Sequence, residues 1–189
     1  MENNLINEEM IFGCFAAAQK GEKLEQSAES FVDVEEYENA VMYPEFARWA
    51  RSAGYPEVSE LFLKVAGEEK LHSVWLRELY SEMGTPAEGN DTARAKATIA
   101  TIKQNCAKLI ENNPQKVIEN ALKVAIRVEE REYQQIYPKF RDQAIEQNNK
   151  KAADVYQRVI DSEREHANWF QAALAQVQTK HATKEAAFA

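Results

Sequence analysis

A pattern of glutamate, histidine and tryptophan occurs twice in this chain at a fixed separation. Glu-x-x-His-x-x-Trp spans residues 69–75 and again residues 163–169, which lie 94 positions further along. The same offset relates VEEYENAVMYPEF, residues 34–46, to VEEREYQQIYPKF, residues 128–140. Two copies are too few for a solenoid, which needs at least three repeats to build a continuous core. The duplication instead predicts two similar helical hairpins, which form a four-helix bundle when they pack face to face.

The number and positions of glycine and proline are typical of an all-α protein. With only six glycines and five prolines in 189 residues, the sequence favours long helices over turn-rich sheet. Gly54 predicts a left-handed helix end. Asn113 predicts an N-cap, with Pro114 at the first helical position. We expect six helices, at about 7–20, 24–53, 57–83, 92–111 and 114–146, and from the QNNKK turn to about 178.

These segments predict one domain over residues 1–189. Its parts are repeat 1 at about 24–83, a linker at 84–91 and repeat 2 at about 114–178. The short helices at 7–20 and 92–111 have no counterpart in a plain four-helix bundle. We expect them to cap the bundle and to close its centre from water, with Phe12 and Phe15 as lid residues. The tail beyond residue 178 is expected to fray.

Acidic residues of both repeats fall on the core-facing stripe of their helices. A helix that faces a core repeats apolar residues at steps of three and four. In each long helix two polar residues take consecutive places in that stripe, near mid-length. They are Glu35 and Glu38, Glu69 and His72, Glu129 and Glu132, and Glu163 and His166. Glu36 and Glu130 lie about 100° away around the helix and are the fallback ligands, whereas Glu68 and Glu165 point away from the core.

A buried layer of this composition predicts metal ions. Burying one unpaired carboxylate costs several kcal/mol, against a total stability of about 5–15 kcal/mol. No Lys or Arg occupies those stripe positions. Carboxylate and imidazole donors suit iron or manganese. Cys14 and Cys106 cannot form a Cys-x-x-Cys site, so a structural zinc site is disfavoured. Two ions would bring the carboxylates close to neutrality.

Several residues near these acids are interpreted as structural rather than as metal ligands or electron carriers. Trp75 and Trp169 follow each histidine by one turn and fit core filling better than electron relay. Tyr37 fits a hydrogen-bond donor to the ligands and an exposed side chain equally well, and His181 fits the surface. A proline inside each of the two long Glu-x-x-Glu helices, after the acids, predicts a kink or a wide turn.

At these residues the chain resembles the rubrerythrin branch of the ferritin-like di-iron carboxylate proteins. The superfamily pattern, a stated property of such bundles, implies six ligands here: Glu35, Glu69, His72, Glu129, Glu163 and His166. Rubrerythrins add a glutamate ahead of a Tyr-Pro, which here is Glu132. This chain also has Glu38 in the first repeat, an eight-ligand arrangement similar to that of two-fold symmetric members of the branch. The resemblance covers about residues 24–174.

The resemblance implies an oxidoreductase that reduces hydrogen peroxide or dioxygen at two iron ions, with manganese as an option at either position. Glu38 and Glu132 are then the candidate catalytic residues, as ligands that move between ions or as proton donors. Rubrerythrins proper carry a rubredoxin domain with four cysteines, whereas this chain has two. We therefore expect an external rubredoxin-like or ferredoxin-like electron donor. Iron storage, an oxygenase acting on an organic substrate, and a purely structural bundle remain alternatives.

The charge and hydropathy of the chain exclude other partners. A net charge of −8 without a basic stripe argues against nucleic acid. No apolar run approaches the ~20 residues that span a bilayer. The acidic N-terminus is unlike a secretory or transit signal. We expect a monomer or small homo-oligomer in the cytoplasm or in a compartment such as the plastid stroma.

Overall fold

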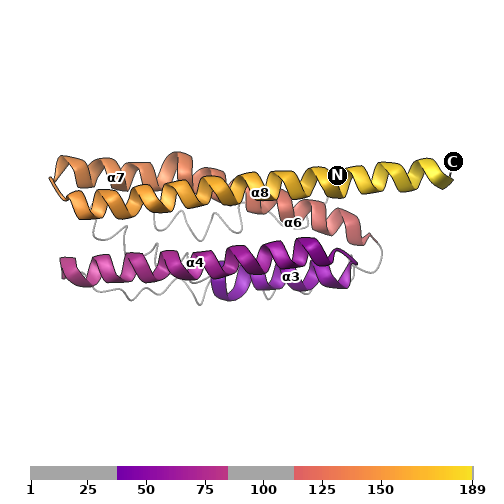
Figure 1. Ribbon diagram of the computed structural model, residues 1–189, viewed down its shortest axis with the longest axis horizontal. Coiled ribbons are helices and arrows are strands. Elements are labelled where there is room, and N and C mark those ends of the chain that lie inside the picture. Colours follow the sequence, from indigo (N-terminus) through magenta and orange to yellow (C-terminus); the bar gives the residue numbers. More distant parts are fainter. Residues whose placement is uncertain (1–37, 85–112, 189) are drawn as a thin grey trace, which may run out of the picture.

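Two helical hairpins lie side by side in the computed structural model, which describes residues 38–84 and 113–188 (Figure 1). The elements in chain order are η1 (Glu38–Met42), α3 (Tyr43–Ser52), α4 (Pro56–Met83), α6 (Pro114–Arg131), η2 (Glu132–Ile136), α7 (Tyr137–Glu146) and α8 (Lys150–Phe188). α3 packs along α4, whereas α6 and α7 follow one another along α8. The predicted all-α bundle is confirmed, and these described segments contain no strand. The predicted helices at 7–20 and 92–111, with Phe12 and Phe15, lie outside the described residues.

The hairpin ends use the residues that the sequence pointed to. Gly54 has φ of +80° just beyond α3, and Gly84 has φ of +72° at the end of α4. Both values lie in the left-handed region, where glycine has no steric penalty. The Asn113 side chain accepts a hydrogen bond from the Lys116 backbone N–H at 3.2 Å, and Pro114 follows it. These caps fix where the helices end, and therefore the register of one helix of a hairpin against the other.

The two helices that carry a proline each contain a π-helical turn directly before it. η1 ends two residues before Pro44, and η2 ends two residues before Pro138. Because proline has no N–H, the carbonyl four residues earlier loses its α-helical partner. The chain instead takes i→i+5 bonds, as between the Tyr137 N–H and the Glu132 carbonyl. Of the two predicted outcomes, the wide turn is therefore the one observed.

The last helix is longer than predicted. We expected it to end at about residue 178 with a frayed tail, but α8 continues to Phe188. Residues 179–188 contain neither glycine nor proline and are rich in alanine and lysine, so nothing in them ends a helix. The Thr179 hydroxyl also donates to the Ala175 carbonyl at 2.8 Å, a bond made within the helix.

The core is apolar on either side of a central polar layer. Toward one end Tyr43, Phe46 and Phe62 pack together with Phe170, and toward the other Tyr137 and Phe140 pack on Tyr156. These side chains are buried. The apolar residues that recur at steps of three and four on the inward faces of α4 and α8 are buried as well, apart from the partly exposed Leu61 and Val155. The polar layer is thus enclosed by packed hydrocarbon above and below.

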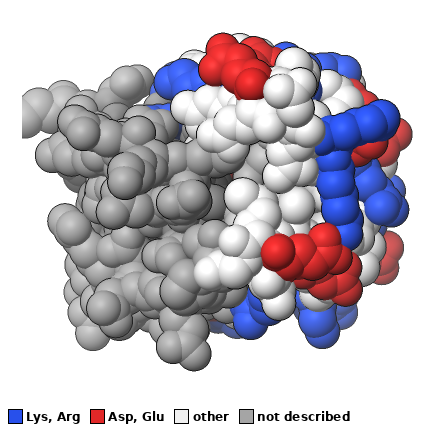
Figure 2. Space-filling model, turned by 90° about the vertical axis from the view of Figure 1, so that its left-hand side faces the viewer, with Lys and Arg blue, Asp and Glu red and all other residues white. Residues whose placement is uncertain are grey.

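The surface at the end of the bundle where α7 turns into α8 carries both charge signs. Figure 2 shows Lys and Arg side chains next to Asp and Glu rather than one sign alone. Lys151 on α8 pairs with Glu82 on α4, which ties the two hairpins together, and Lys150 pairs with Asp154 at 2.5 Å. None of the described helices contains a stretch that is both long and apolar enough to cross a bilayer.

Candidate metal centre

Five polar side chains meet in the middle of the bundle without any exposure to solvent. Glu69 and His72 come from α4, Glu129 from α6, and Glu163 and His166 from α8. Within each Glu-x-x-His pair the two residues are three apart, so they project from adjacent turns on the same helix face. The duplication therefore places two equivalent pairs opposite one another.

The two Glu-x-x-His glutamates each contact both histidines. Glu69 has Oε2 at 2.9 Å from His72 Nδ1 and Oε1 at 3.0 Å from His166 Nδ1. Glu163 has Oε1 at 2.8 Å from His72 Nδ1 and Oε2 at 3.0 Å from His166 Nδ1. The imidazole rings themselves lie 5.6 Å apart and are nearly parallel. Two positions are thus defined, one in front of each Nδ1, and the same two carboxylates reach both.

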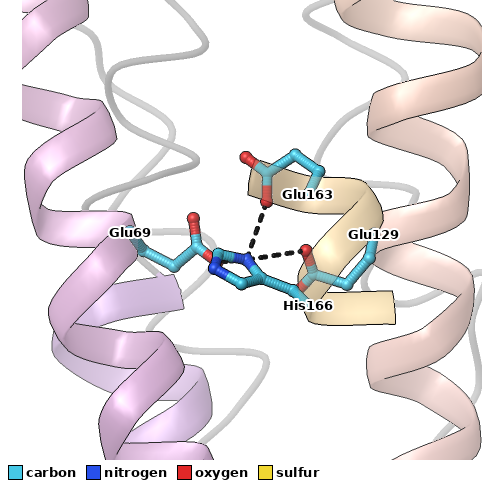
Figure 3. Close-up of side chains that lie close together, drawn as sticks. All are labelled: Glu69, Glu129, Glu163 and His166. Carbon is cyan, nitrogen blue, oxygen red and sulfur yellow. Dashed lines mark hydrogen bonds and ion pairs between the residues drawn. The ribbon is translucent and has the colours of Figure 1, made fainter. Parts of the chain in front are cut away.

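The position in front of His166 has a third carboxylate. Glu129 Oε2 lies 3.3 Å from His166 Nδ1, and Glu69, Glu129, Glu163 and His166 each offer a ligand atom within 4.8 Å of the others (Figure 3). One imidazole nitrogen carries at most one proton. Three carboxylate oxygens therefore surround an atom that can donate to one of them, which leaves an excess of acceptors.

Nothing basic among the described residues compensates these acids apart from the two histidines. Each hydrogen-bond or ion-pair partner of Glu69, Glu129 and Glu163 in the described segments is a histidine or Tyr43. Burial raises the pKa of Glu129 well above its usual range, and the charges of Glu69 and Glu163 raise it further. The protein alone thus disfavours the charged form of Glu129.

The histidines shift the balance for the two shared glutamates. Burial acts to raise the pKa of Glu163, but His72 and His166 outweigh it and hold that pKa well below the usual value. Burial likewise acts to lower the pKa of His166, but Glu69, Glu129 and Glu163 raise it well above the ordinary value. The buried carboxylates therefore favour the protonated, positively charged form of His166.

The spacing of the donors is also compatible with metal ions. Two ligands bound at about 2.1 Å and at right angles lie about 3 Å apart, since carboxylate oxygen and imidazole nitrogen bind first-row ions at about 2.0–2.2 Å. The nitrogen–oxygen separations of 2.8–3.3 Å around the two Nδ1 atoms match that spacing. Oxygen and nitrogen donors without thiolate are the set that suits iron and manganese.

The remaining predicted ligands are placed as follows. Glu38 and Glu132 are buried at the first residue of η1 and η2, outside the four-residue cluster of Figure 3. Glu129 points inward, whereas Glu130 is partly exposed and accepts a hydrogen bond from Gln171 Nε2 at 3.0 Å. Glu35, with its fallback Glu36 and the neighbouring Tyr37, lies outside the described residues.

Two functional contacts were missed by the sequence analysis. The Tyr43 hydroxyl donates a hydrogen bond to Glu129 Oε1, and burial together with Glu129 and Glu38 raises the Tyr43 pKa well above its usual value, so it remains a donor. The repeat of Tyr-Pro at the 94-residue offset was the signal for this tyrosine. Glu68, which was expected to point away from the core, has Oε2 at 3.1 Å from His166 Nε2. Helical phase placed its Cα correctly but could not show how far its side chain reaches.

The two tryptophans pack against the apolar core and also contact the histidines. Trp75 contacts His72 and Trp169 contacts His166, each at 5.4 Å between ring centroids. Both are partly exposed, and a cation from the opposite hairpin covers each ring. Arg158 lies 3.7 Å from the Trp75 centroid, and Lys64 lies 3.2 Å from that of Trp169. The predicted packing against the core is therefore observed, although both rings are also partly exposed.

Comparisons with known proteins point to one family. The Rubrerythrin family model matches residues 34–174. Symerythrin from Cyanophora paradoxa is 35% identical over 160 residues, which cover 85% of this chain and 87% of that protein. A putative rubrerythrin from Methanocaldococcus jannaschii is 29% identical over 136 residues, covering 72% of this chain and 62% of its own length.

A solved structure extends the agreement to the fold. The crystal structure of symerythrin from Cyanophora paradoxa, reduced with dithionite, superposes with a TM-score of 0.75 at 34% identity and covers 84% of this chain and 87% of that one. The resemblance to the rubrerythrin branch, and to symerythrin within it, is thereby confirmed, as is the ferritin-like bundle. The chain belongs to the rubrerythrin family of di-iron oxidoreductases.

Proposed function

We propose that this chain binds two iron ions, or iron with manganese, and reduces hydrogen peroxide or dioxygen to water with electrons from an external donor. The observation that carries the proposal is the pair of shared carboxylates. Glu69 and Glu163 each direct one oxygen toward each imidazole, which is the arrangement needed to bridge two ions. His72 and His166 would then hold one ion each, and Glu129 would complete the position at His166.

The metal ions, when bound, would supply the electrons and the Lewis acidity that cleave an O–O bond. Hydrogen peroxide takes up two electrons and two protons to give two waters, and dioxygen takes up four of each. The protein must therefore deliver protons into a dry interior. Glu38 and Glu132, both buried at π-turns, are the groups we assign to proton delivery or to a change of ligand as the charge of the centre changes.

Tyr43 and the residues around it hold the site in place. Its hydroxyl donates to Glu129 and so fixes one carboxylate oxygen, while the ring packs against Phe62 and Phe170 at centroid distances of 5.9 Å and 5.4 Å. These apolar rings keep water from that side of the layer. Water exclusion strengthens each charge interaction at the centre because the local dielectric constant is low.

The electrons are assigned to a separate carrier of the rubredoxin or ferredoxin type. The 189 residues contain two cysteines, too few for a four-cysteine iron site of the rubredoxin kind. We further propose that the chain works as a monomer or small homo-oligomer. A large shell seen in a mass measurement would favour iron storage instead.

Metal loading followed by a single turnover tests the proposal. The metal-free protein is loaded with Fe(II) without oxygen, its iron content is measured, and it is then mixed rapidly with hydrogen peroxide. We expect two irons per chain and oxidation of both by one peroxide, followed by absorbance in the near ultraviolet. Protein that binds iron but stays reduced with both peroxide and dioxygen would rule out this activity.

A further inference from the structure

We infer that Lys64 and Arg158 protect the two tryptophans beside the centre, Trp169 and Trp75, from one-electron oxidation. The need for this protection rests on the proposed function, because a centre that reduces peroxide or dioxygen exposes its neighbours to oxidising equivalents. The protection itself is a property of the described side chains, and it is tested without metal.

Each tryptophan connects one histidine to the surface of the bundle. The ring centroid of Trp75 lies 5.4 Å from that of His72, and the same distance separates Trp169 from His166. Both histidines are fully buried, whereas both tryptophans are partly exposed. Indole is among the side chains that lose an electron most readily. Each imidazole of the centre therefore has an oxidisable ring in contact with it.

A cation from the opposite hairpin lies over each indole. Lys64 Nζ, on α4, lies 3.2 Å from the ring centroid of Trp169 on α8. The guanidinium carbon of Arg158, on α8, lies 3.7 Å from the ring centroid of Trp75 on α4. Residues 64 and 158 are 94 positions apart, as are 75 and 169. Both copies of the repeat thus place a positive charge over the ring, although the basic residue differs.

A positive charge over an indole favours the reduced form of the ring. The neutral ring attracts the cation through the electron density of its face. Loss of one electron turns the ring into a radical cation, so that attraction gives way to repulsion between two positive charges. Glu68 Oε1 lies 3.8 Å from Lys64 Nζ and offsets part of that repulsion, whereas Nζ is closer to the Trp169 centroid. The cations therefore make electron loss from these two rings less favourable.

Oxidation of the metal-free chain with hexachloroiridate(IV) tests the inference. Each Ir(IV) takes one electron from an indole and becomes Ir(III), the indole N–H proton passes to water, and dioxygen from the air then adds to the ring. Peptide mass mapping follows the added oxygen at each tryptophan separately. Because the oxidant is an anion, removing a lysine or an arginine slows its approach. Faster oxidation in such a variant therefore cannot result from attraction of the reagent.

We expect each neutral variant to affect the tryptophan of the opposite hairpin alone. Lys64→Gln should raise the oxidation rate of Trp169 by about tenfold. Arg158→Gln should do the same for Trp75. Lys64→Arg keeps the charge and should behave like the unchanged protein. Lys70→Gln, at an exposed lysine on the same helix as Lys64, is the matched control and should change neither rate.

A further variant separates the charge from simple cover of the ring. Lys64→Leu keeps an apolar side chain over Trp169 without a charge, so it should oxidise as fast as Lys64→Gln. Slow oxidation of Trp169 in either of these variants would overturn the inference. Faster oxidation that extends equally to the fully buried Trp49 would also overturn it, because the bundle would then have opened as a whole. Since the assay contains no metal, failure of the two-iron centre would leave its result unchanged.

Discussion

The two halves of the bundle share their Glu-x-x-His pairs and differ in the layer next to them. Tyr43 and Tyr137 occupy equivalent places, but Tyr43 packs against Phe62 and Phe170, whereas Tyr137 packs against Tyr156. Position 62 corresponds to 156, so a phenylalanine in one half is a tyrosine in the other. The Tyr156 hydroxyl then lies 3.3 Å from that of Tyr80.

The difference shows which positions of a duplicated fold are free to diverge. The charged layer requires a carboxylate and an imidazole at defined atoms, and few residue types supply those donors at the same reach. Packing requires about the right volume and a partner for each polar atom, which several residue combinations satisfy. In the packing layer next to the charged residues, polar side chains therefore occur in pairs: Tyr156 is present together with Tyr80, whose hydroxyl is its partner.

Removing both bridging carboxylates should have the largest effect, because each of them serves both halves at once. In Glu69→Gln/Glu163→Gln we expect iron bound per chain to fall from two to near zero, measured by elemental analysis after anaerobic loading. Glu165→Gln, an exposed acid on the same helix as Glu163, is the matched control and should bind iron normally. Loss at one position with full occupancy of the other would show that the carboxylates are not shared.

The second largest effect is expected from removing a ring of the phenylalanine cluster next to Tyr43. Phe62→Ala removes a fully buried ring between Tyr43, Phe46 and Phe170 and should lower the free energy of unfolding of the metal-free protein by about 3–5 kcal/mol. Urea denaturation measures it. Leu63→Ala, at a neighbouring side chain that is 48% exposed, should cost far less. Equal losses in the two variants would mean that the ring cluster does not carry the packing of this half.

The hydrogen bond of Tyr43 should have an intermediate effect. Tyr43→Phe keeps the ring and removes the donor to Glu129, so we expect a loss of about 1–3 kcal/mol in stability, measured in the same way. Because that bond fixes a predicted ligand, iron affinity at the His166 position should fall as well. Normal affinity together with normal stability would remove Tyr43 from the site.

The corresponding change in the other half should be the mildest. Tyr156→Phe makes position 156 resemble position 62 and removes only the long contact with Tyr80, so stability should change by about 1 kcal/mol or less. Iron binding should be unaffected. A loss as large as that of Tyr43→Phe would show that the two hydroxyls act as one network with the charged layer.

The sequence was sufficient for the features that periodicity and repetition encode. The stripe that alternates apolar residues with Glu69 and His72 showed which side of α4 faces inward. The positions of Pro44 and Pro138 predicted a kink or a wide turn, and the structure has the wide turn. Gly54 and Asn113 marked helix ends because their backbone or side-chain chemistry is local.

Features that depend on reach across the bundle could not be predicted in this way. Glu68 lies off the stripe of its own helix, and only the packing of α4 against α8 brings its carboxylate to His166. The hydrogen bond from Tyr43 to Glu129 likewise joins residues 86 positions apart. The end of α8 was missed for a different reason, because alanine and lysine continue a helix where no glycine or proline stops it.

The two π-turns also indicate the order in which the wide turn and the duplication of the hairpin arose. η1 and η2 begin at Glu38 and Glu132, at the same offset as the rest of the repeat. A π-turn amounts to one extra residue inserted into an α-helix. Since both copies contain it at the same point, the simplest sequence of events is that a single ancestral hairpin gained the residue first and was copied afterwards. The wide turn then predates the duplication that joined the two hairpins in one chain.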